Sequence, residues 1–200
     1  MLRKLRLLLW VLVLVAAGAT AWLILRQGNT APPASTARMD LGGPFTLVGA
    51  DGQPFSSARL NGRPYAIFFG FTHCPDVCPT TLARMVRLRN QLGQGDGAFD
   101  IVFVSVDPER DGPKEVGAYA QLFGSRVIGL SGSQPQIDQV KKQFGIYSQK
   151  VPDGAGSYTV DHTATVLLFG KDGRFDSTIA HEEQDSAALD KLRRIAGLAP

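Results

Sequence analysis

Two apolar segments on either side of a helical pattern constrain the fold of this 200-residue chain more than any other feature. The segments YAIFFGF, residues 65–71, and DIVFVSVD, residues 100–107, have the length and apolar character of strands buried on both faces. Between them, TLARMVRLRNQL carries apolar residues largely at helical spacing. A strand–helix–strand unit of this kind predicts two parallel strands in a sheet that is covered by helices.

The patterns around this unit extend it to an α/β domain over residues 44–200. They predict a hairpin at 44–55, helices at 111–124 and 134–145, two strands at 162–170 and 171–180, and a final helix at 184–198. Asp111 has the position of an N-cap residue. This order of elements predicts a thioredoxin-like fold, in which a central mixed β-sheet is flanked by helices. In such a sheet, reactive groups lie at the carboxyl ends of the central strands.

The N-terminal part contains a 19-residue segment without charge, residues 7–25, which is long enough for a transmembrane helix. Three basic residues precede it and only Arg26 follows, so the positive-inside rule places residues 1–6 in the cytoplasm. A cleaved signal peptide is the alternative, with ATA at 19–21 as the cleavage site, but the apolar run continues beyond it. Residues 26–43 are rich in Pro, Ala, Ser and Gly, and we interpret them as a linker.

These segments predict a single-pass protein of the bacterial inner membrane whose C-terminal domain lies in the periplasm. The formal net charge of the whole chain is +3. Four of its 21 basic residues lie in residues 1–26, which leaves 17 basic residues against all 18 acidic residues in the exported part. Because that part is nearly neutral and has no basic stripe, we expect no binding to nucleic acid.

Both cysteines of the chain lie in the segment FGFTHCPDVCPTTL, residues 69–82. Cys74 follows the first buried strand, and Cys78 lies in the first turn of the next helix. Their spacing places the two Cα atoms roughly 6 Å apart, which a disulfide can bridge, and a helix N-terminus favours thiolates. A purely structural disulfide is disfavoured, because closing so short a loop removes little chain entropy. A redox pair and a metal site both remain open.

His162 is the residue that distinguishes these two alternatives. It is predicted to lie directly before a strand, and in a thioredoxin-like fold this position faces the helix that carries the cysteines. A thiol oxidoreductase normally has a proline there, but the nearest upstream proline is Pro152. Two thiolates and an imidazole suit copper, whereas structural zinc sites take four ligands and the sequence offers no fourth.

Several neighbouring polar residues are candidates for roles around this site or at the surface. Asp161 is a candidate for holding the His162 imidazole, with a surface role as the alternative. Asp107 ends the second buried strand and is a candidate for presenting charge to a partner. Residues 107–111, DPERD, are interpreted as a solvated turn before a helix. The remaining polar candidates are expected at the surface: His181, Arg84, Arg87 and Arg89.

The chain resembles the Sco/SenC family of copper proteins, which act in cytochrome c oxidase assembly. The resemblance rests on GGPFTL, FFGFTHCPDVCPTTL, VFVSVDPERDGP, FGIYSQ and YTVDHTATVLLF, from about residue 40 onward. It implies a thioredoxin-like fold on a single membrane anchor. It also implies one copper ion per chain, Cu(I) or Cu(II), with Cys74, Cys78 and His162 as ligands.

The same resemblance implies a metallochaperone that delivers copper to the binuclear copper centre of cytochrome c oxidase, or helps that centre to mature. The implied partners are the copper-bearing subunit of the oxidase and a copper donor chaperone. A conventional enzyme is not expected. The alternative function is a thiol–disulfide oxidoreductase, in which Cys74 and Cys78 form a redox-active pair that reduces cysteines of the oxidase subunit or of another copper protein.

Overall fold

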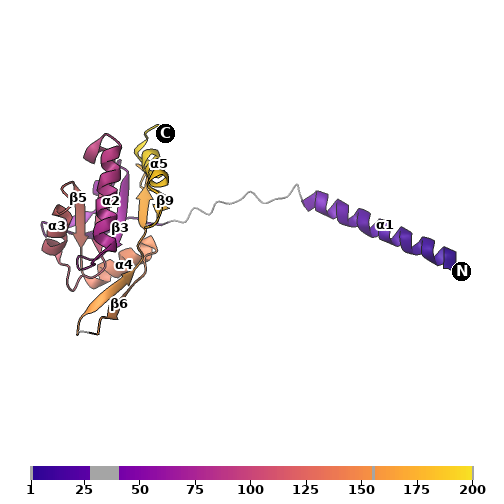
Figure 1. Cartoon of the computed structure of the whole chain (residues 1–200), viewed down its shortest axis with the longest axis horizontal. Helices are drawn as coiled ribbons and strands as arrows, with labels where there is room; N and C mark the ends of the chain where they lie inside the picture. Colours follow the sequence, from indigo (N-terminus) through magenta and orange to yellow (C-terminus); the bar gives the residue numbers. More distant parts are fainter. Residues whose placement is uncertain (1, 28–40, 155, 200) are drawn as a thin grey trace. The chain divides into compact units, whose positions relative to one another are not determined.

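The computed structural model describes residues 2–27, 41–154 and 156–199, and the chain divides into two compact units, Met1–Arg38 and Met39–Pro200 (Figure 1). In the first unit, Leu2–Gln27 forms helix α1. A transmembrane span requires about 20 consecutive, predominantly apolar residues in a helix. Among the residues that the structure describes, no helix is long and apolar enough to cross a membrane. The transmembrane anchor predicted at residues 7–25 is therefore not confirmed.

The predicted linker at residues 26–43 falls mostly on 28–40, which lie outside the described residues. The boundary between the two compact units lies within this predicted linker, between Arg38 and Met39. The second unit begins close to the predicted start of the globular domain.

The second unit is built on a seven-stranded mixed sheet with the strand order β2-β1-β5-β4-β3-β8-β9. The strands are β1 (Thr46–Gly49), β2 (Pro54–Ser56), β3 (Tyr65–Gly70), β4 (Asp100–Ser105), β5 (Val127–Ser131), β8 (Val166–Phe169) and β9 (Phe175–Ile179). Strands β3, β4 and β5 pair in parallel, and the others pair antiparallel. All six residues of β3 and of β4 are buried, which explains their near-continuous apolar sequences. The predicted mixed sheet and thioredoxin-like fold are confirmed.

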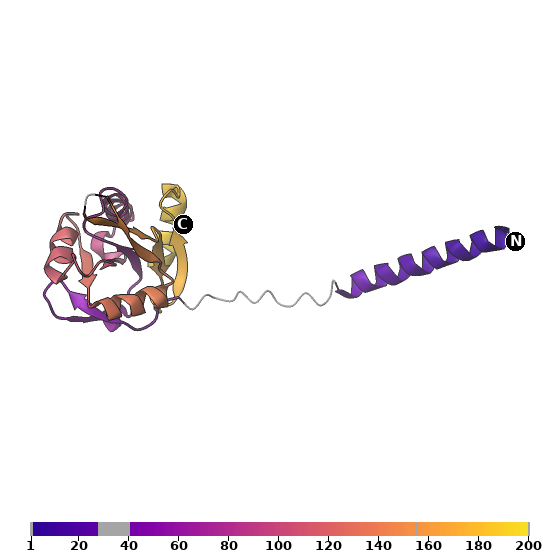
Figure 2. The same cartoon turned by 90° about the horizontal axis from the view of Figure 1, so that it is seen from below.

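Helices cover both faces of this sheet. They are α2 (Val77–Gln91), α3 (Pro113–Gln121), α4 (Gln134–Phe144) and α5 (Asp185–Ala196), with short 3-10 helices at Ser57–Leu60 and Gly95–Gly97. Right-handed crossovers from β3 to β4 and from β4 to β5 place α2 and α3 on the same face. On the opposite face, Phe144 of α4 packs against Phe69 of β3, with ring centroids 5.4 Å apart. Figure 2 shows α4 alone below the sheet.

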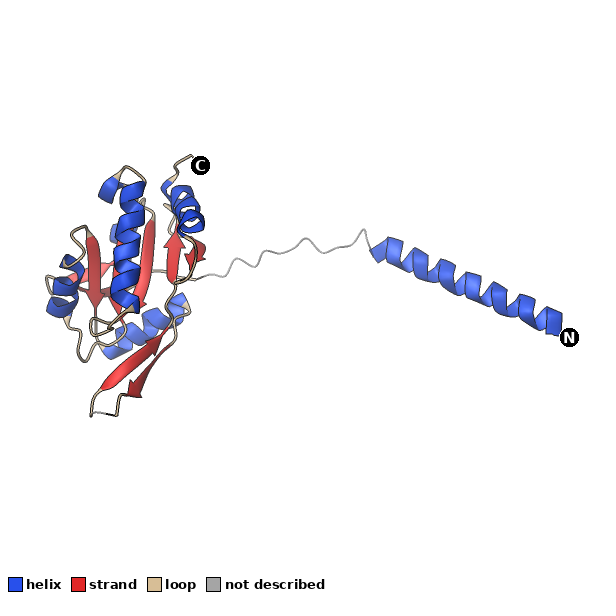
Figure 3. Cartoon of the chain, in the orientation of Figure 1, coloured by secondary structure: helices blue, strands red, loops and turns tan. Residues whose placement is uncertain are grey.

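Three strands were not predicted: β5, which lies within the sheet, and two further strands outside it. β6 (Ser148–Pro152) and β7 (Tyr158–His162) form a separate antiparallel ribbon, which projects from the domain beside the sheet (Figure 3). His162 is therefore the last residue of β7, where it pairs with Ser148. The strand predicted to begin at His162 begins at Val166 instead. These bounds follow from strand pairing: β7 pairs with its sequence neighbour β6, and β8 pairs with β9 and with the distant strand β3.

The surface positions predicted for Arg84 and Arg89 are wrong. The Arg89 side chain is fully buried and donates to the carbonyl oxygens of Phe99 and Arg126, at 3.2 and 2.8 Å. Arg84 lies largely buried and forms an ion pair with Asp185 at the start of α5. Both arginines satisfy backbone carbonyls or carboxylates at loop ends, which compensates the cost of burying their charges.

Candidate metal centre

The two cysteines lie where β3 passes into α2. Cys74 is in the connecting loop and is half-buried, and Cys78 is the second residue of α2 and is fully buried. Pro79 follows in the first helical turn, where a missing N–H leaves no hydrogen bond unmade. The backbone N–H of Cys78 also lies in this first turn, so it has no acceptor within the helix. It donates instead to Cys74 Sγ at 3.4 Å. The helix N-terminus therefore stabilises a thiolate at Cys74.

The carboxyl end of β3 is shaped to receive Cys78. A Cβ atom placed on Gly70 would lie 2.6 Å from Cys78 Sγ and 3.1 Å from the rings of Phe68 and Phe103. A side chain at position 70 would therefore displace the sulfur. Glycine allows Cys78 Sγ to pack directly on the backbone of the central strand.

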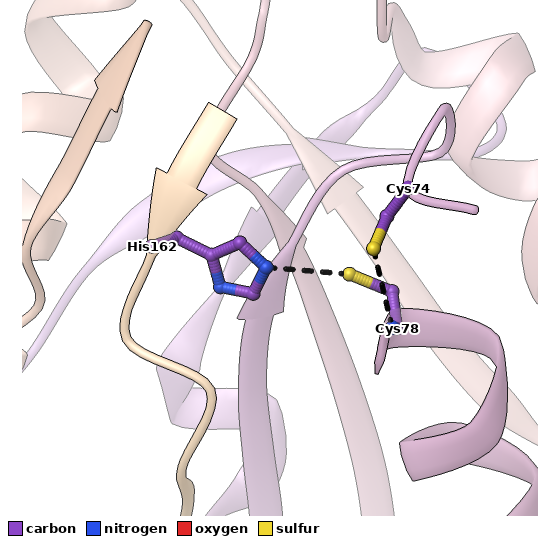
Figure 4. A group of neighbouring side chains, drawn as sticks. All are labelled: Cys74, Cys78 and His162. Carbon is purple, nitrogen blue, oxygen red and sulfur yellow. Dashed lines mark hydrogen bonds between the residues drawn. The ribbon is translucent and has the colours of Figure 1, made fainter. Parts of the chain in front are cut away.

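His162 brings the third donor atom from β7. Its Nε2 atom lies 3.5 Å from Cys78 Sγ, and the donor atoms of Cys74, Cys78 and His162 all lie within 4.8 Å of one another (Figure 4). Cys78 and His162 are 84 residues apart in the sequence. The structure thus brings together the three residues that the sequence analysis singled out.

The backbone orients the His162 ring. Nδ1 lies 3.0 Å from the carbonyl oxygen of Thr163, so Nδ1–H donates to this oxygen. The lone pair of the neutral ring is then on Nε2, which faces Cys78 Sγ. The ring also packs edge-on against Phe68 and Phe71, with centroids 5.9 and 5.8 Å away. A hydrogen bond and two aromatic contacts hold the imidazole in the orientation that a metal ligand needs.

The two thiols differ in acidity. The hydrogen bond with the Cys78 side chain lowers the pKa of Cys74, and hydrogen bonds from the backbone add to this effect. The same pairing raises the pKa of Cys78, together with its burial and the nearby carboxylate of Asp111. These opposite directions favour a thiolate at Cys74 and a thiol at Cys78 in the reduced pair.

The two predicted acidic neighbours lie in different surroundings. Asp161 is exposed on β7, and the Thr163 carbonyl, rather than Asp161, contacts Nδ1 of His162. Asp107 has a fully buried side chain, which accepts hydrogen bonds from Tyr158 and Arg110. The prediction that Asp107 presents its charge to a partner is wrong, because its carboxylate is already paired inside the protein.

The role of Asp111 was not predicted from the sequence. The N-cap of α3 is Gly112, and the buried Asp111 carboxylate instead accepts hydrogen bonds from the backbone N–H and the hydroxyl of Thr72, at 2.8 and 2.6 Å. Ser105 donates to it as well, at 2.6 Å. Thr72 lies two residues before Cys74, so Asp111 fixes the start of the cysteine loop. In the sequence, Asp111 appears only as the second aspartate of DPERD, and an aspartate at this position also suits a helix N-cap.

A small cavity opens beside Cys74 and His162. It has a volume of about 190 Å³, and its lining includes Phe71, Cys74, Pro75, Asp161 and His162. Cys74 is half-buried and lines this cavity, whereas Cys78 is fully buried. An ion or a partner's thiol can therefore reach the site from the side of Cys74.

The donor set determines which chemistry the site supports. Within the described ranges, Cys74, Cys78 and His162 are the one group of three cysteine, histidine or acidic residues placed to hold a metal ion. The two thiolate sulfurs are soft ligands that favour Cu(I), and the imidazole nitrogen also suits copper. Structural zinc would require a fourth ligand. The residues fit a three-coordinate copper ion, and the same sulfurs are close enough for thiol chemistry.

Fold and site together define a class of thioredoxin-like proteins with a cysteine–histidine metal site at the end of a central strand. Residues 33–197 match the family model described as SCO1/SenC. The chain belongs to this family. It is 37% identical over 138 residues to the human protein named Protein SCO1 homolog, mitochondrial. The match covers 68% of this chain but 46% of the human protein, so the chain spans less than half of that relative's length.

Solved structures agree with this assignment. The structure of Bradyrhizobium japonicum ScoI with copper bound has a TM-score of 0.70 and 39% sequence identity, over 78% of this chain and 99% of that chain. A second solved structure is that of BsSco, which has a TM-score of 0.63 and 26% sequence identity. BsSco is described as having a disulfide switch and as a member of the Sco family of cytochrome c oxidase assembly proteins. That match covers 82% of this chain and 98% of BsSco.

Proposed function

We propose that this protein binds one copper ion through Cys74, Cys78 and His162 and delivers it to the binuclear copper centre of cytochrome c oxidase, or helps that centre to mature. The observation that carries the proposal is the approach of the three donor atoms to within 4.8 Å. Copper is bound in the structure of a relative with 39% sequence identity. Another relative is described as an oxidase assembly protein.

The geometry supports both loading and release. Cys74, which is accessible and already a thiolate, makes the first contact with the metal. Cys78 then loses its proton, and His162 contributes Nε2 without reorienting, because Thr163 already holds its ring. Few ligands and the open side at Cys74 allow a partner's thiolate to enter by ligand exchange. Oxidation of the two cysteines to a disulfide removes two of the three ligands and so prevents binding.

The second candidate function is thiol–disulfide oxidoreduction, which the unequal burial of the two sulfurs favours. The Cys74 thiolate, which lines the cavity, attacks a partner's disulfide and forms a mixed disulfide, while one partner sulfur leaves as a thiolate. Cys78, after losing its proton, attacks Cys74 and releases the second partner thiolate. Two electrons pass to the partner, and the Cys74–Cys78 disulfide remains. The disulfide switch described for BsSco is consistent with this chemistry.

The partners and the compartment are part of this proposal. We infer that the copper-bearing oxidase subunit receives the metal and that a copper donor chaperone supplies it. The proposed location is the bacterial inner membrane, with the domain in the periplasm. The basic residues before the apolar N-terminal segment support this orientation. Alkaline phosphatase fused after Gly43 tests the location, since it is active only when exported. An inactive fusion would contradict export.

A copper titration tests the main proposal. Reduced protein is titrated anaerobically with Cu(I) against a competing chelator, in the wild type and in His162→Ala. We expect one tightly bound copper ion in the wild type and weaker binding in the variant. His181→Ala is the matched control, because His181 lies outside the three-residue site and should leave the affinity unchanged. Wild-type affinity in His162→Ala would favour the oxidoreductase function instead.

A further inference from the structure

The turn that follows β4 contacts the ribbon that carries His162. In this turn the backbone N–H groups of Arg110 and Asp111 donate to the carbonyl oxygen of Asp107. The buried Asp107 carboxylate accepts a hydrogen bond from Arg110 Nε and another from the Tyr158 hydroxyl, the latter at 2.9 Å. Tyr158 is the first residue of β7. One carboxylate therefore joins the turn to the start of the ribbon strand.

Arg110 also contacts Tyr158 directly. Its guanidinium carbon lies 3.8 Å from the centroid of the Tyr158 ring, and its Nη1 donates to the Tyr158 carbonyl oxygen at 2.8 Å. Tyr158 and His162 lie at the two ends of β7, four residues apart, so their side chains point to the same face of the ribbon. Val160 lies between them on this face and is buried. Fixing Tyr158 therefore fixes the face from which His162 projects.

The same turn also holds the cysteine loop. Asp111 accepts two hydrogen bonds from Thr72, as described above. Arg110 lies 5.8 Å from the centroid of the Phe71 ring, and Phe71 packs against the imidazole of His162. The ribbon β6–β7 does not belong to the seven-stranded sheet. Its position relative to the cysteines therefore depends on contacts such as these.

From these contacts we propose that Asp107, Arg110 and Tyr158 are positioning residues of the metal centre. They set the distance between His162 Nε2 and the two sulfurs by clamping β7 to the turn that also anchors the cysteine loop. This inference rests on the proposed copper-binding function. Loss of a group that orients a metal ligand typically weakens metal affinity about 10–100-fold. We expect a loss of about tenfold in Cu(I) affinity when Tyr158 is replaced by alanine.

The matched control is Tyr147→Ala. Tyr147 is a tyrosine directly before β6 and is 58% exposed, and its hydroxyl donates to Gln149 rather than to the turn. We expect this variant to bind Cu(I) as the wild type does. In a His162→Ala background, Tyr158→Ala should cause no further loss, because its effect acts through the imidazole. If Tyr158→Ala does not fold, Tyr158→Phe, which loses only the hydroxyl, should show a smaller loss in the same direction.

A second measurement needs no metal. In the metal-free reduced protein, nuclear Overhauser contacts between the rings of His162 and Phe71 report where the imidazole lies. We expect these contacts in the wild type and in Tyr147→Ala, and their loss in Tyr158→Ala and Arg110→Ala. Retained ring contacts in both clamp variants would overturn the inference, whether or not copper binds. Unchanged affinity in His162→Ala would overturn the proposed ligand set instead, so the two failures are distinguishable.

Discussion

Replacing Gly70 with alanine tests how closely Cys78 packs against the end of β3. The added Cβ would lie 2.6 Å from Cys78 Sγ, whereas ordinary contact distances are about 3.5–4.0 Å. The sulfur must therefore move by about 1 Å, and the rings of Phe68 and Phe103 at 3.1 Å leave little room for the movement. Overpacking of this kind costs about 1–3 kcal/mol of folding stability. The displacement also moves Cys78 relative to His162 Nε2.

Two measurements follow for Gly70→Ala. Urea denaturation of the reduced, copper-free protein should show a free energy of unfolding lowered by about 1–3 kcal/mol. Cu(I) titration should show an affinity at least about tenfold weaker, which corresponds to about 1.4 kcal/mol of binding free energy.

Gly97→Ala is the control, because a Cβ at this position meets no atom within 4 Å and the backbone there lies outside the left-handed region. We expect little change in stability or affinity in the control. Wild-type stability and affinity in Gly70→Ala would refute the argument that Cys78 Sγ packs directly on the strand backbone.

Three further predictions concern the thiols and the buried arginine. Because the pKa of Cys78 is raised and that of Cys74 is lowered, copper binding at neutral pH should release one proton. The copper affinity should therefore rise about tenfold per pH unit. A pH-independent affinity in the titration would contradict this prediction. Iodoacetamide at pH 7 should modify Cys74 much faster than Cys78, as mass spectrometry can show, and equal rates would contradict the assigned thiolate. Arg89→Ala should lower the free energy of unfolding by about 3 kcal/mol, because Arg89 is fully buried. Arg87 is exposed, so Arg87→Ala should lower it by at most about 1 kcal/mol. Equal losses for the two variants in urea denaturation would contradict the role of Arg89.

Sequence patterns predicted the strands and helices that a local run or spacing of apolar residues identifies. The strands β3 and β4 are buried on both faces, so their apolar runs identified them. The helix α2 followed from its spacing of apolar residues. Strand β5 (Val127–Ser131) was missed because it is stabilised by pairing with β4 and β1, which lie far away in the sequence. The ribbon strands are close to each other in the sequence, but they were missed because neither has a continuous apolar run. The predicted transmembrane anchor at residues 7–25 also came from local composition, and the described residues do not confirm it.

For the metal centre, the sequence by itself determined that Cys74 and Cys78 are neighbours, since a four-residue spacing at a helix start leaves them little freedom to separate. It did not determine the environment of charged side chains. Asp107 and Asp111 both follow β4 and were expected to be solvated, yet both are fully buried and hydrogen-bonded. The tertiary structure decided this, because their partners, Thr72 and Tyr158, come from segments 39 and 51 residues away. The approach of His162 to Cys78 across 84 residues has the same cause: it exists only once the ribbon packs against the sheet.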